Sequence, residues 1–482
     1  MIHTYRIISL LIFNISIISG VAIAQEWSWQ SVSELQASLN SGAVTSYELT
    51  EYFLDRAATY NPKLAAVIEL NPEALSEARA LDQERQVSGP RSALHGIPIW
   101  LKDNINTRGP LHTSGCTLAL AEAVAYEDAA LVKRLRQAGA VILGKTTMTE
   151  LANFMTADMP AGYSSRCGQG KNPYGPGRLS PGGSSSGSAI AVAVGLAPIA
   201  IGTETSGSII SPASQNLVVG IKPTLGLVNM DGVMPIAPSQ DTAGPIAINV
   251  TDAAIALSGL TGRNYLASLN REGAKDKRIG FDPSLLESLE PWQQELVWEA
   301  MRALRKAGAF FFYIEVPTLP EVRARTSTVL VHEFGPAMDA YLQGLDSEID
   351  SLAELVEYNQ AHPEAIRFGQ TLLEAALASQ GESGQQAYEH DREADLELAK
   401  VAGLDAAFKT YRLDAILFPK NLGAAIGAKA GYPSVVVPAG RGPDGEPMGV
   451  AFLGQAHQEA KLLEIAYAYE QASRAWVAPR GF

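Results

Sequence analysis

A stretch rich in glycine and serine, GGSSSGSAIAVAVGLAPIAIGTETSGS, spans residues 182–208 and holds two serine clusters on either side of an apolar segment. The stretch contains no His, Cys, Asp or Lys, and Glu204 is its only charged residue. Serine at its ordinary pKa is a poor nucleophile and needs a neighbouring base to attack a carbonyl carbon. If this stretch is a catalytic centre, another part of the chain must therefore supply the base.

One interpretation of the stretch is a phosphate-binding loop, because Gly182 and Gly187 have the spacing of the G-x-x-x-x-G motif. That motif follows a strand and continues with a lysine that reaches the phosphates. Ser188 occupies the lysine position, and the preceding segment does not have the pattern of a strand. The chemistry of a phosphate site is therefore missing.

A second interpretation is a nucleophile elbow, since residues 183–187 satisfy G-x-S-x-G with Ser185 as the nucleophile. An elbow needs a buried strand directly before it and a catalytic histidine downstream. The lead-in KNPYGPGRLSP has the composition of a loop, and no signature accompanies the downstream histidines, which are His332, His362, His390 and His457. We keep the elbow as the alternative.

A third interpretation pairs Ser184 with Ser208 and adds Lys102, which ends the apolar segment GIPIWLK. Together these residues resemble the amidase signature family, whose catalytic unit is a lysine and two serines. The resemblance runs from about Trp27 to Trp476 and includes HGIPIWLKDN, GYSSRCGQGKNPYG, VVGIKPTLGLV, SQDTAGPIA and GVAFLGQ. Within the family, TETSGS, SQDTAGPIA, EYNQAHPE and AYAYEQAS are most similar to the peptide amidase branch, which removes the C-terminal amide of peptides.

The resemblance implies that Ser208 attacks the amide carbonyl and that Ser184, after a cis peptide bond, bridges it to the base Lys102. A lysine at its ordinary pKa, near 10.4, is neutral in only about one molecule in 2,500 at pH 7, so we expect Lys102 to be buried. The resemblance also implies an oxyanion hole made by the backbone N–H groups of Thr205, Ser206, Gly207 and Ser208.

Other polar residues near these motifs have structural interpretations. Asp103 follows Lys102 directly and should point to the opposite face of a strand. Asp241, in SQDTAGP, is expected to fix a turn. Serines in such loops commonly bond neighbouring backbone groups, which is the role expected for the remaining serines Ser185, Ser186 and Ser188.

The sequence departs from the common family pattern at three places. Ser206 replaces the usual glycine of T-G-G-S, Ile210 stands where many members carry arginine, and the segment 418–434 is short, with Lys420 in place of a threonine-rich loop. These changes leave the predicted triad intact. They bear on the acyl pocket, which we expect Lys420 to border.

The elements that position these residues alternate between strand and helix. Capping boxes at Ser31 and Thr45 predict two opening helices. Strands are predicted at 65–70, 96–104, 141–146 and 198–205, with helices at 73–86 and near 128–138. This alternation predicts an α/β fold with a central sheet covered by helices on both faces. The resemblance to the amidase signature family implies that this sheet is mixed and twisted.

The later part of the chain is rich in Glu, Ala and Leu, which predicts a mostly helical insertion around residues 283–410. Strand patterns return at 413–419 and 433–440 and are expected to rejoin the same sheet. No Pro/Ser linker or composition break separates them. We therefore predict one large amidase signature domain over residues 25–482.

Composition limits the class of protein. The chain has 482 residues, of which 46% are hydrophobic and 18% charged, as in soluble globular proteins. A net charge of −14 with no long basic run argues against a nucleic-acid partner. The two cysteines, Cys116 and Cys167, permit at most one disulfide and exclude a four-cysteine metal site.

The first 24 residues resemble a signal peptide. Arg6 precedes an apolar run over residues 7–21, and Ala22-Ile23-Ala24 has the small-x-small pattern of a cleavage site. The run is short for a membrane span, so we expect an exported protein, periplasmic or secreted, with no membrane attachment after cleavage.

We predict that the protein hydrolyses a carboxamide, and the expected substrate is the C-terminal amide of a peptide. The reaction is expected to need no cofactor and no metal. An aryl or alkyl acylamidase acting on a non-peptide substrate is the second interpretation. A periplasmic binding protein that has lost turnover is the third, and the intact lysine and serines argue against it. An amidotransferase subunit is disfavoured by the signal peptide. The expected assembly is a monomer or homodimer.

Overall fold

The structure, a computed structural model, describes residues 26–325 and 328–482. The predicted signal peptide over residues 1–24 lies outside this described part. Two helices, α1 (Val32–Ser41) and α2 (Ser46–Leu64), open it, and both predicted capping boxes are present. In the second box the Thr45 side chain accepts a hydrogen bond from Glu48 N at 3.1 Å while Thr45 N donates to the Glu48 carboxylate at 2.8 Å.

A single mixed sheet of 11 strands runs through the described part of the molecule. In sheet order the strands are β1 (Val67–Leu70), β4 (Val141–Thr146), β2 (Pro98–Lys102), β7 (Ile199–Glu204), β9 (Thr242–Ala247), β8 (Val219–Lys222), β14 (Ser434–Arg441), β15 (Pro447–Leu453), β13 (Ala415–Pro419), β10 (Arg278–Phe281) and β11 (Phe310–Tyr313). All the strands predicted from the sequence belong to this sheet, including the two late ones.

Three neighbouring strands carry or lead into the predicted catalytic residues. β2 lies between β4 and β7 and is parallel to both. Every residue of these three strands is buried, as expected for parallel strands covered on both faces. Because they are parallel, their carboxyl ends, which include Lys102 and Glu204, meet at one edge of the sheet.

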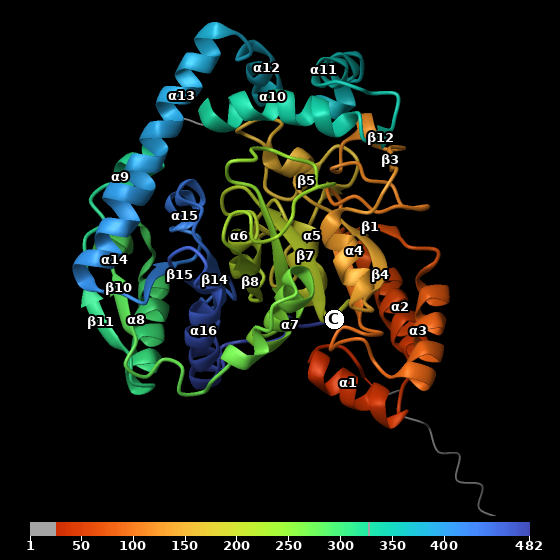
Figure 1. Cartoon of the computed structure of the whole chain (residues 1–482), viewed down its shortest axis with the longest axis horizontal. Helices are drawn as coiled ribbons and strands as arrows, with labels where there is room; N and C mark the ends of the chain where they lie inside the picture. Colours follow the sequence, from red (N-terminus) through yellow and green to blue (C-terminus); the bar gives the residue numbers. More distant parts are fainter. Residues whose placement is uncertain (1–25, 326–327) are drawn as a thin grey trace, which may run out of the picture.

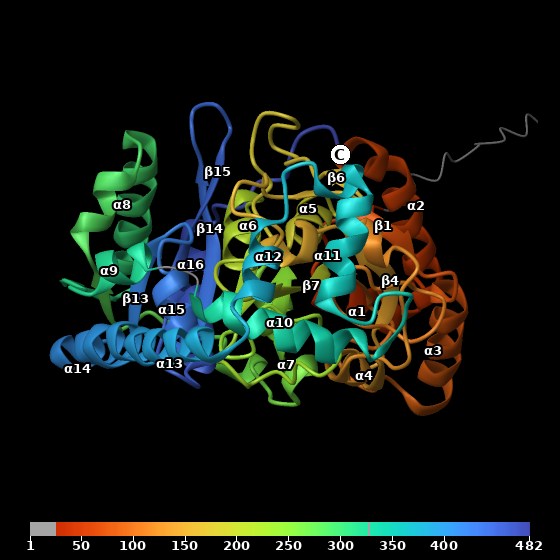
Figure 2. The same cartoon turned by 90° about the horizontal axis from the view of Figure 1, so that it is seen from above.

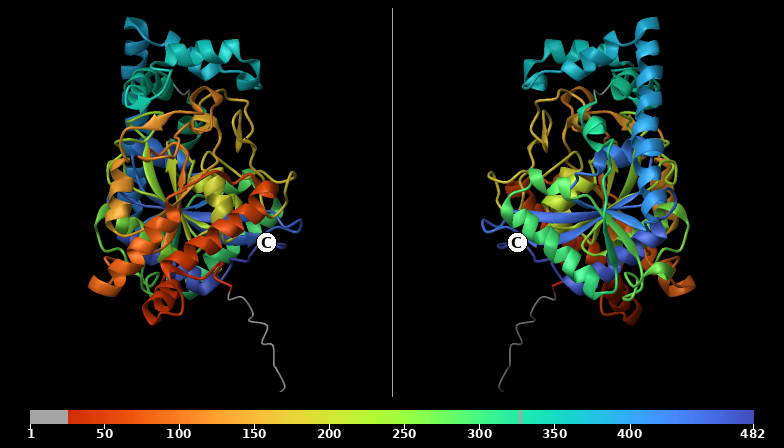
Figure 3. Two further views of the ribbon diagram at one scale, coloured as in Figure 1. Left: turned by 90° about the vertical axis from the view of Figure 1, so that its right-hand side faces the viewer. Right: turned by 90° about the vertical axis from the view of Figure 1, so that its left-hand side faces the viewer.

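Helices cover both faces of the sheet, which Figure 3 shows edge on with the strands fanned by their twist. α5 (Ser186–Ala193) packs against β2 and β7, α7 (Val250–Thr261) against β9, and α16 (Glu459–Ser473) against β14. The other helices outside residues 283–410 are α3 (Ala74–Ser88), α4 (Ala130–Gln137), α6 (Ile210–Gln215) and α15 (Ala424–Ala430). The predicted single α/β domain with a mixed, covered sheet is confirmed.

The segment over residues 283–410 holds helices and two short strands. Its α-helices are α8 (Pro291–Lys306), α9 (Leu319–Ala324), α10 (Thr328–Leu342), α11 (Leu352–Ala361), α12 (Thr371–Ala378), α13 (Glu382–Leu396) and α14 (Ala406–Tyr411), and a π-helix at Glu397–Asp405 connects the last two. β11 joins the main sheet beside β10, so this segment also supplies an edge strand. β12 (Leu345–Asp346) pairs with β3 (Val124–Ala125) in a separate two-stranded ribbon.

Helices α10 to α12 close over one edge of the sheet. They lie at the top of Figure 1, and Figure 2 shows α11 and α12 crossing the centre of the molecule above β7. Tyr341 on α10 donates a hydrogen bond to Asn106 Oδ1 at 2.6 Å, just beyond the carboxyl end of β2. The rings of Phe334 and Phe154 pack at 4.5 Å between centroids. These helices therefore cover the loops that follow β2 and β4.

Candidate active site

Lys102 is the last residue of β2 and is fully buried. The preceding strand residues Ile99, Trp100 and Leu101 are also buried, so the end of β2 that carries Lys102 lies inside the protein. Burial lowers the pKa of Lys102 to about 7, and the charges of Asp241 and Glu204 only partly offset this effect. A substantial fraction of Lys102 is therefore neutral at physiological pH.

The amine of Lys102 has well-defined partners. Lys102 Nζ donates to Ser184 Oγ at 2.7 Å, to Thr203 Oγ1 at 2.8 Å and to the Thr203 carbonyl at 3.3 Å. Thr203 also accepts a bond at its Oγ1 from Asn104 Nδ2 at 3.0 Å. Asn104 belongs to the motif HGIPIWLKDN and Thr203 to the motif TETSGS, but no role was predicted for either residue. Thr203 also lies in the predicted strand 198–205, two positions before Thr205.

Ser184 is held by the backbone on both sides. The Gly183–Ser184 peptide bond is cis, as the family resemblance implied. The Ser184 carbonyl accepts a hydrogen bond from Thr149 N at 3.0 Å, which ties it to the loop after β4. The Ser184 side chain is fully buried. Its hydroxyl is thus fixed beside the lysine.

Ser208 lies in the loop between β7 and α6 and is 8% exposed. Its carbonyl accepts a hydrogen bond from Ser185 N at 3.1 Å, so the segment carrying Ser208 runs directly alongside the one carrying Ser184. Because β7 and β2 are adjacent parallel strands, the loop after β7 comes to the edge where Lys102 ends. The structure therefore brings the three predicted catalytic residues to one place.

The loop before Ser208 presents backbone donors. The N–H groups of Ser206, Gly207 and Ser208 make no hydrogen bond to any described residue, whereas those of Ile209 and Ile210 donate to Glu204 Oε2 at 2.7 and 2.9 Å. Gly207 has φ of +86°, a conformation that favours glycine. Free amide donors in a tight loop are suited to binding an oxyanion.

Asp241 fixes a turn, as predicted, and makes one further contact that the sequence did not predict. Its Oδ2 accepts from Ile236 N at 2.8 Å and from Ala237 N at 2.9 Å. Its Oδ1 accepts a hydrogen bond from Thr205 Oγ1. Burial raises the pKa of Asp241 to about 7. The same carboxyl group therefore holds both its own turn and the first residue of the Thr205–Ser208 loop.

The other serines of the stretch are engaged in structure. Ser185 Oγ donates to the Thr203 carbonyl at 3.1 Å, and Ser186 Oγ donates to the Gly182 carbonyl at 2.6 Å. Ser188 Oγ bonds Thr146 Oγ1 at 2.7 Å. All three are fully buried, which agrees with their predicted structural role.

The described residues lack the strand before Ser185 that a nucleophile elbow requires. Residues 171–185 form no strand, so Ser185 is not presented at the end of one. Two of the downstream histidines bond within the helical segment: His332 Nδ1 to the Ser379 carbonyl at 3.1 Å, and His362 Nδ1 to the Tyr358 carbonyl at 2.8 Å. Neither contacts the serine stretch.

Asp103 bonds away from Lys102, as expected for the next residue along. Its Oδ2 accepts from Ser114 Oγ at 2.5 Å and from Cys116 N at 2.8 Å. The buried cation that offsets its charge is Lys145, whose Nζ donates to the Ile105 carbonyl at 2.6 Å. Asp103 therefore organises the loop after β2 and leaves the Lys102 amine without a carboxylate partner.

The short turn that includes Lys420 lies against the predicted oxyanion loop. A Cβ placed on Gly207 would stand 3.4 Å from both Asn421 Nδ2 and the Cβ of Ala424. Lys420 itself is half-buried, and its N–H donates to the Gly449 carbonyl at 2.9 Å. Asn421, which the sequence motifs did not identify, is thus the polar side chain of this turn that approaches Gly207.

Metal-ligand clusters and membrane-spanning helices are both missing from the described residues. No His, Cys, Asp and Glu side chains gather there in a group that would hold a metal ion. None of the helices within residues 26–325 and 328–482 is long and apolar enough to cross a membrane. The expectation that the enzyme needs no metal stays a prediction.

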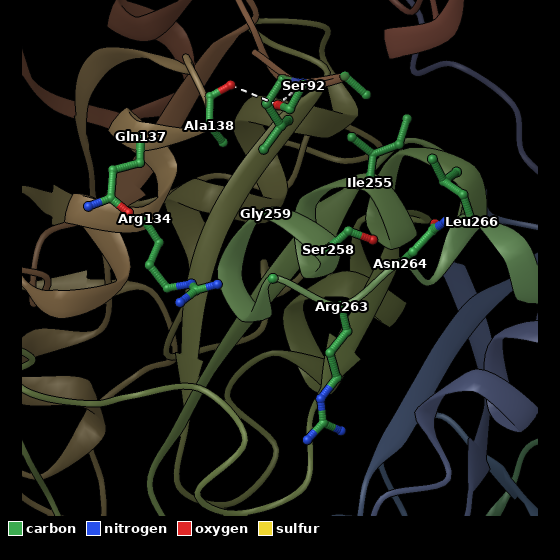
Figure 4. A pocket seen from close by; sticks show the side chains of 13 residues that line it. Ser92, Arg134, Gln137, Ala138, Ile255, Ser258, Gly259, Arg263, Asn264 and Leu266 are labelled. Atoms are coloured by element: carbon green, nitrogen blue, oxygen red, sulfur yellow. Dashed lines mark hydrogen bonds between the residues drawn. The ribbon is translucent and has the colours of Figure 1, made fainter.

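A cavity of about 420 Å³ lies away from the site and is shown in Figure 4. Its lining includes Leu94 and Ala138, which precede β2 and β4, together with Arg134 from α4 and Ser258 from α7. Lys102 ends β2 at the opposite edge of the sheet. This cavity therefore plays no part in the arrangement around the serines.

The site combines a buried lysine, two serines and a loop whose backbone N–H groups are free among the described residues. The family model described as Amidase matches residues 48–430. The chain therefore belongs to the amidase family, which confirms the resemblance found in the sequence. A probable amidase from Arabidopsis thaliana is 36% identical over 96% of this chain and 94% of that protein.

Solved structures give the same result. The native peptide amidase from Stenotrophomonas maltophilia matches 94% of this chain and 98% of its own, with 42% identity and a TM-score of 0.89. A structure of the peptide amidase PAM with the competitive inhibitor chymostatin matches 94% of this chain and 99% of its own, with 43% identity and a TM-score of 0.89. The protein is an amidase and hydrolyses amides.

Proposed function

We propose that the protein hydrolyses peptide C-terminal amides by a Ser-Ser-Lys mechanism through an acyl-enzyme on Ser208. The observation that carries the mechanism is the 2.7 Å hydrogen bond between the buried Lys102 Nζ and Ser184 Oγ, beside the segment that holds Ser208. The preference for peptide amides rests on the 42% identity with the Stenotrophomonas peptide amidase over nearly the whole chain.

In the proposed first step, neutral Lys102 takes the proton of Ser184, and Ser184 takes the proton of Ser208 as Ser208 Oγ attacks the amide carbon. The same relay run in reverse protonates the leaving nitrogen, so ammonia departs and the acyl group stays on Ser208. Water then gives its proton to the same relay and attacks the acyl-enzyme, which releases the acid and restores the Ser208 hydroxyl. The 2.7 Å bond between Lys102 Nζ and Ser184 Oγ supports the first transfer, and the bond from Ser185 N to the Ser208 carbonyl at 3.1 Å supports the second by holding the two serine segments side by side.

Negative charge develops on the carbonyl oxygen during both steps. The proposed oxyanion hole uses backbone N–H groups of Thr205, Ser206, Gly207 and Ser208, of which the last three have no other acceptor among the described residues. Where such donors have been removed in other enzymes, the loss was about 2.7–4 kcal/mol each. Glu204 supports this role indirectly, because it occupies the next two amides and fixes where the loop turns into α6.

An aryl or alkyl acylamidase is the competing function on the same machinery. A panel of matched substrates distinguishes the peptide amidase from the acylamidase function. The panel holds a peptide amide, the free peptide, an anilide of the same acyl group and the corresponding ester. Ammonia release measures the first, and chromophore or acid release the others. We expect the peptide amide to have the highest kcat/KM and the free peptide to be inert. A higher kcat/KM for the anilide would assign the acylamidase function instead.

We also propose that the protein is exported, on the basis of Arg6, the apolar run at 7–21 and Ala22-Ile23-Ala24. N-terminal sequencing of the protein recovered from a bacterial periplasmic fraction tests this proposal. Mature protein should begin at Gln25. Protein that stays in the cytosol with Met1 intact would contradict export without touching the catalytic proposal.

A further inference from the structure

The two cysteines of the chain lie together although 51 positions separate them in sequence. The thiol of Cys167 contacts Cys116 Sγ at 3.1 Å, and both residues are free thiols in this structure. Cys116 is fully buried, while Cys167 is partly exposed. A disulfide bond is about 2.0 Å long, so bonding these sulfurs needs a relative shift of about 1 Å.

The segments that carry the two thiols are already joined by other contacts. Arg166 N donates to the Cys116 carbonyl at 3.3 Å, and Arg166 Nη1 donates to Ser114 Oγ at 2.8 Å. Leu118 N donates to Ser165 Oγ at 3.1 Å. Three hydrogen bonds therefore fix the hairpin of β5 (Tyr163–Ser164) and β6 (Gly168–Gln169) against the loop after β2. The sulfurs meet because the backbone around them is held.

The loop that carries Cys116 also belongs to the surroundings of the catalytic lysine. Cys116 N donates to Asp103 Oδ2 at 2.8 Å, and Asp103 follows Lys102 directly. On the other side, Glu150 accepts from Ser165 N and from Ser165 Oγ, both at 2.7 Å. A covalent link between the thiols would tie this loop to the hairpin at the edge of the sheet where Lys102 ends.

We propose that Cys116 and Cys167 form an intramolecular disulfide when the protein meets an oxidant of the disulfide class, and that this bond clamps the loop after β2 to the β5–β6 hairpin. The inference does not depend on the proposed substrate. A metal site is not the role of this pair, because no third ligand from His, Cys, Asp or Glu joins it within the described chain.

The exchange balances with oxidised glutathione as the oxidant. The thiolate of the partly exposed Cys167 attacks one sulfur of the glutathione disulfide, whose S–S bond breaks and releases one glutathione thiolate. Cys116 Sγ then attacks Cys167 Sγ and gives up its proton, while the bond between Cys167 and glutathione breaks and the departing glutathione sulfur takes up a proton. The glutathione thiolate released first also takes up a proton. The protein loses two hydrogens, and glutathione disulfide is reduced to two thiols.

The test uses the full-length protein, incubated with oxidised glutathione or with a reductant, then denatured and treated with a thiol alkylating agent. We expect the oxidised sample to take up no alkyl group and to have lost two hydrogens by intact mass. A peptide containing Cys116 should be joined to one containing Cys167 after proteolysis. Two alkyl groups, or glutathione adducts that persist without cross-linking, would overturn the proposal.

Thermal unfolding supplies the second measurement. A disulfide that closes a loop of this size restricts the unfolded chain, so the oxidised wild type should have the higher Tm, by a few degrees. Cys167→Ser is the matched control, because it keeps a small polar group at the partly exposed position; its Tm should not respond to reductant. A wild-type Tm equal in both redox states would overturn the clamp, and a reductant-sensitive Cys167→Ser would assign the effect elsewhere.

Discussion

Lys102 Nζ lies 2.7 Å from Ser184 Oγ, and its remaining hydrogen bonds go to two atoms of Thr203. No carboxylate accepts a bond from this amine among the described residues. A lysine buried beside a carboxylate would keep its proton in an ion pair, whereas one buried against hydroxyl and carbonyl oxygens is more easily neutral. The pairing with Ser184 therefore places an amine that can be neutral against a hydroxyl group, and the next two predictions test whether this amine is the base.

The rate should depend on pH through Lys102. Burial places the pKa of this lysine at about 7, and only its neutral form accepts the proton of Ser184. We therefore expect kcat/KM to rise by about tenfold per pH unit well below pH 7 and to level off above pH 8. Initial rates of ammonia release at low substrate concentration between pH 5 and 9 measure the profile. A flat profile would contradict a lysine base.

Removal of the amine should abolish most of the activity. Lys102→Met keeps an apolar chain of similar length but offers no base, so kcat should fall roughly 10³-fold or more. Lys222→Met is the matched control. Lys222 is also buried, at the end of β8, and its one hydrogen bond to a described residue goes to the Pro223 carbonyl at 3.3 Å. The control should keep activity within a few-fold. Equal losses in both variants would show that burial of a lysine, rather than its contact with Ser184, matters.

The bond between Thr205 and Asp241 should act on the transition state. Thr205→Val removes the hydroxyl that donates to Asp241 Oδ1, which frees the first residue of the proposed oxyanion hole and leaves a buried carboxyl oxygen unpaired. We expect kcat to fall about tenfold with little change in KM, whereas Thr205→Ser keeps the bond and most of the rate. A rise in KM alone would place Thr205 in ground-state binding.

The turn beside Gly207 should influence substrate choice through Asn421. Its amide nitrogen approaches Gly207 and no described residue bonds its side chain, so it is available to a peptide carbonyl. Asn421→Ala should lower kcat/KM for peptide amides by about tenfold, the value of one hydrogen bond.

Lys420→Met is the neighbouring comparison, tested with acidic and neutral peptide amides. A change in their ratio would assign the acyl preference to Lys420, as the sequence suggested.

Much of this site could be predicted from sequence because its residues sit in short, distinctive segments. Lys102 ends an apolar strand, and Ser184 and Ser208 lie in glycine-rich loops whose composition is unusual. β4 was predicted at its observed bounds because a short, mostly apolar run follows a clear helix. A strand that is buried on both faces has a short, mostly apolar sequence, and this local pattern can be recognised without the rest of the fold.

The supporting contacts could not be predicted in the same way. The bond from Thr205 to Asp241 joins residues from two strand ends, and Asn421 reaches Gly207 from a turn more than 200 residues later in the chain. The first pair depends on β7 and β9 being antiparallel neighbours, and the second brings the turn after β13 to the loop after β7, although other strands separate β13 from β7 in the sheet. Order and direction arise from packing of the whole sheet, which no local pattern encodes.

The most direct test of the Ser-Ser-Lys account is to locate the covalent intermediate. Wild-type protein is treated with a fluorophosphonate, digested, and the modified peptide is identified by mass spectrometry. The account predicts a single label on Ser208, complete loss of amide hydrolysis in Ser208→Ala, and no labelling of that variant. Ser185→Ala, which removes a hydroxyl bonded to the Thr203 carbonyl, should still be labelled at Ser208. A label on Ser185, or hydrolysis that survives in Ser208→Ala, would contradict the account.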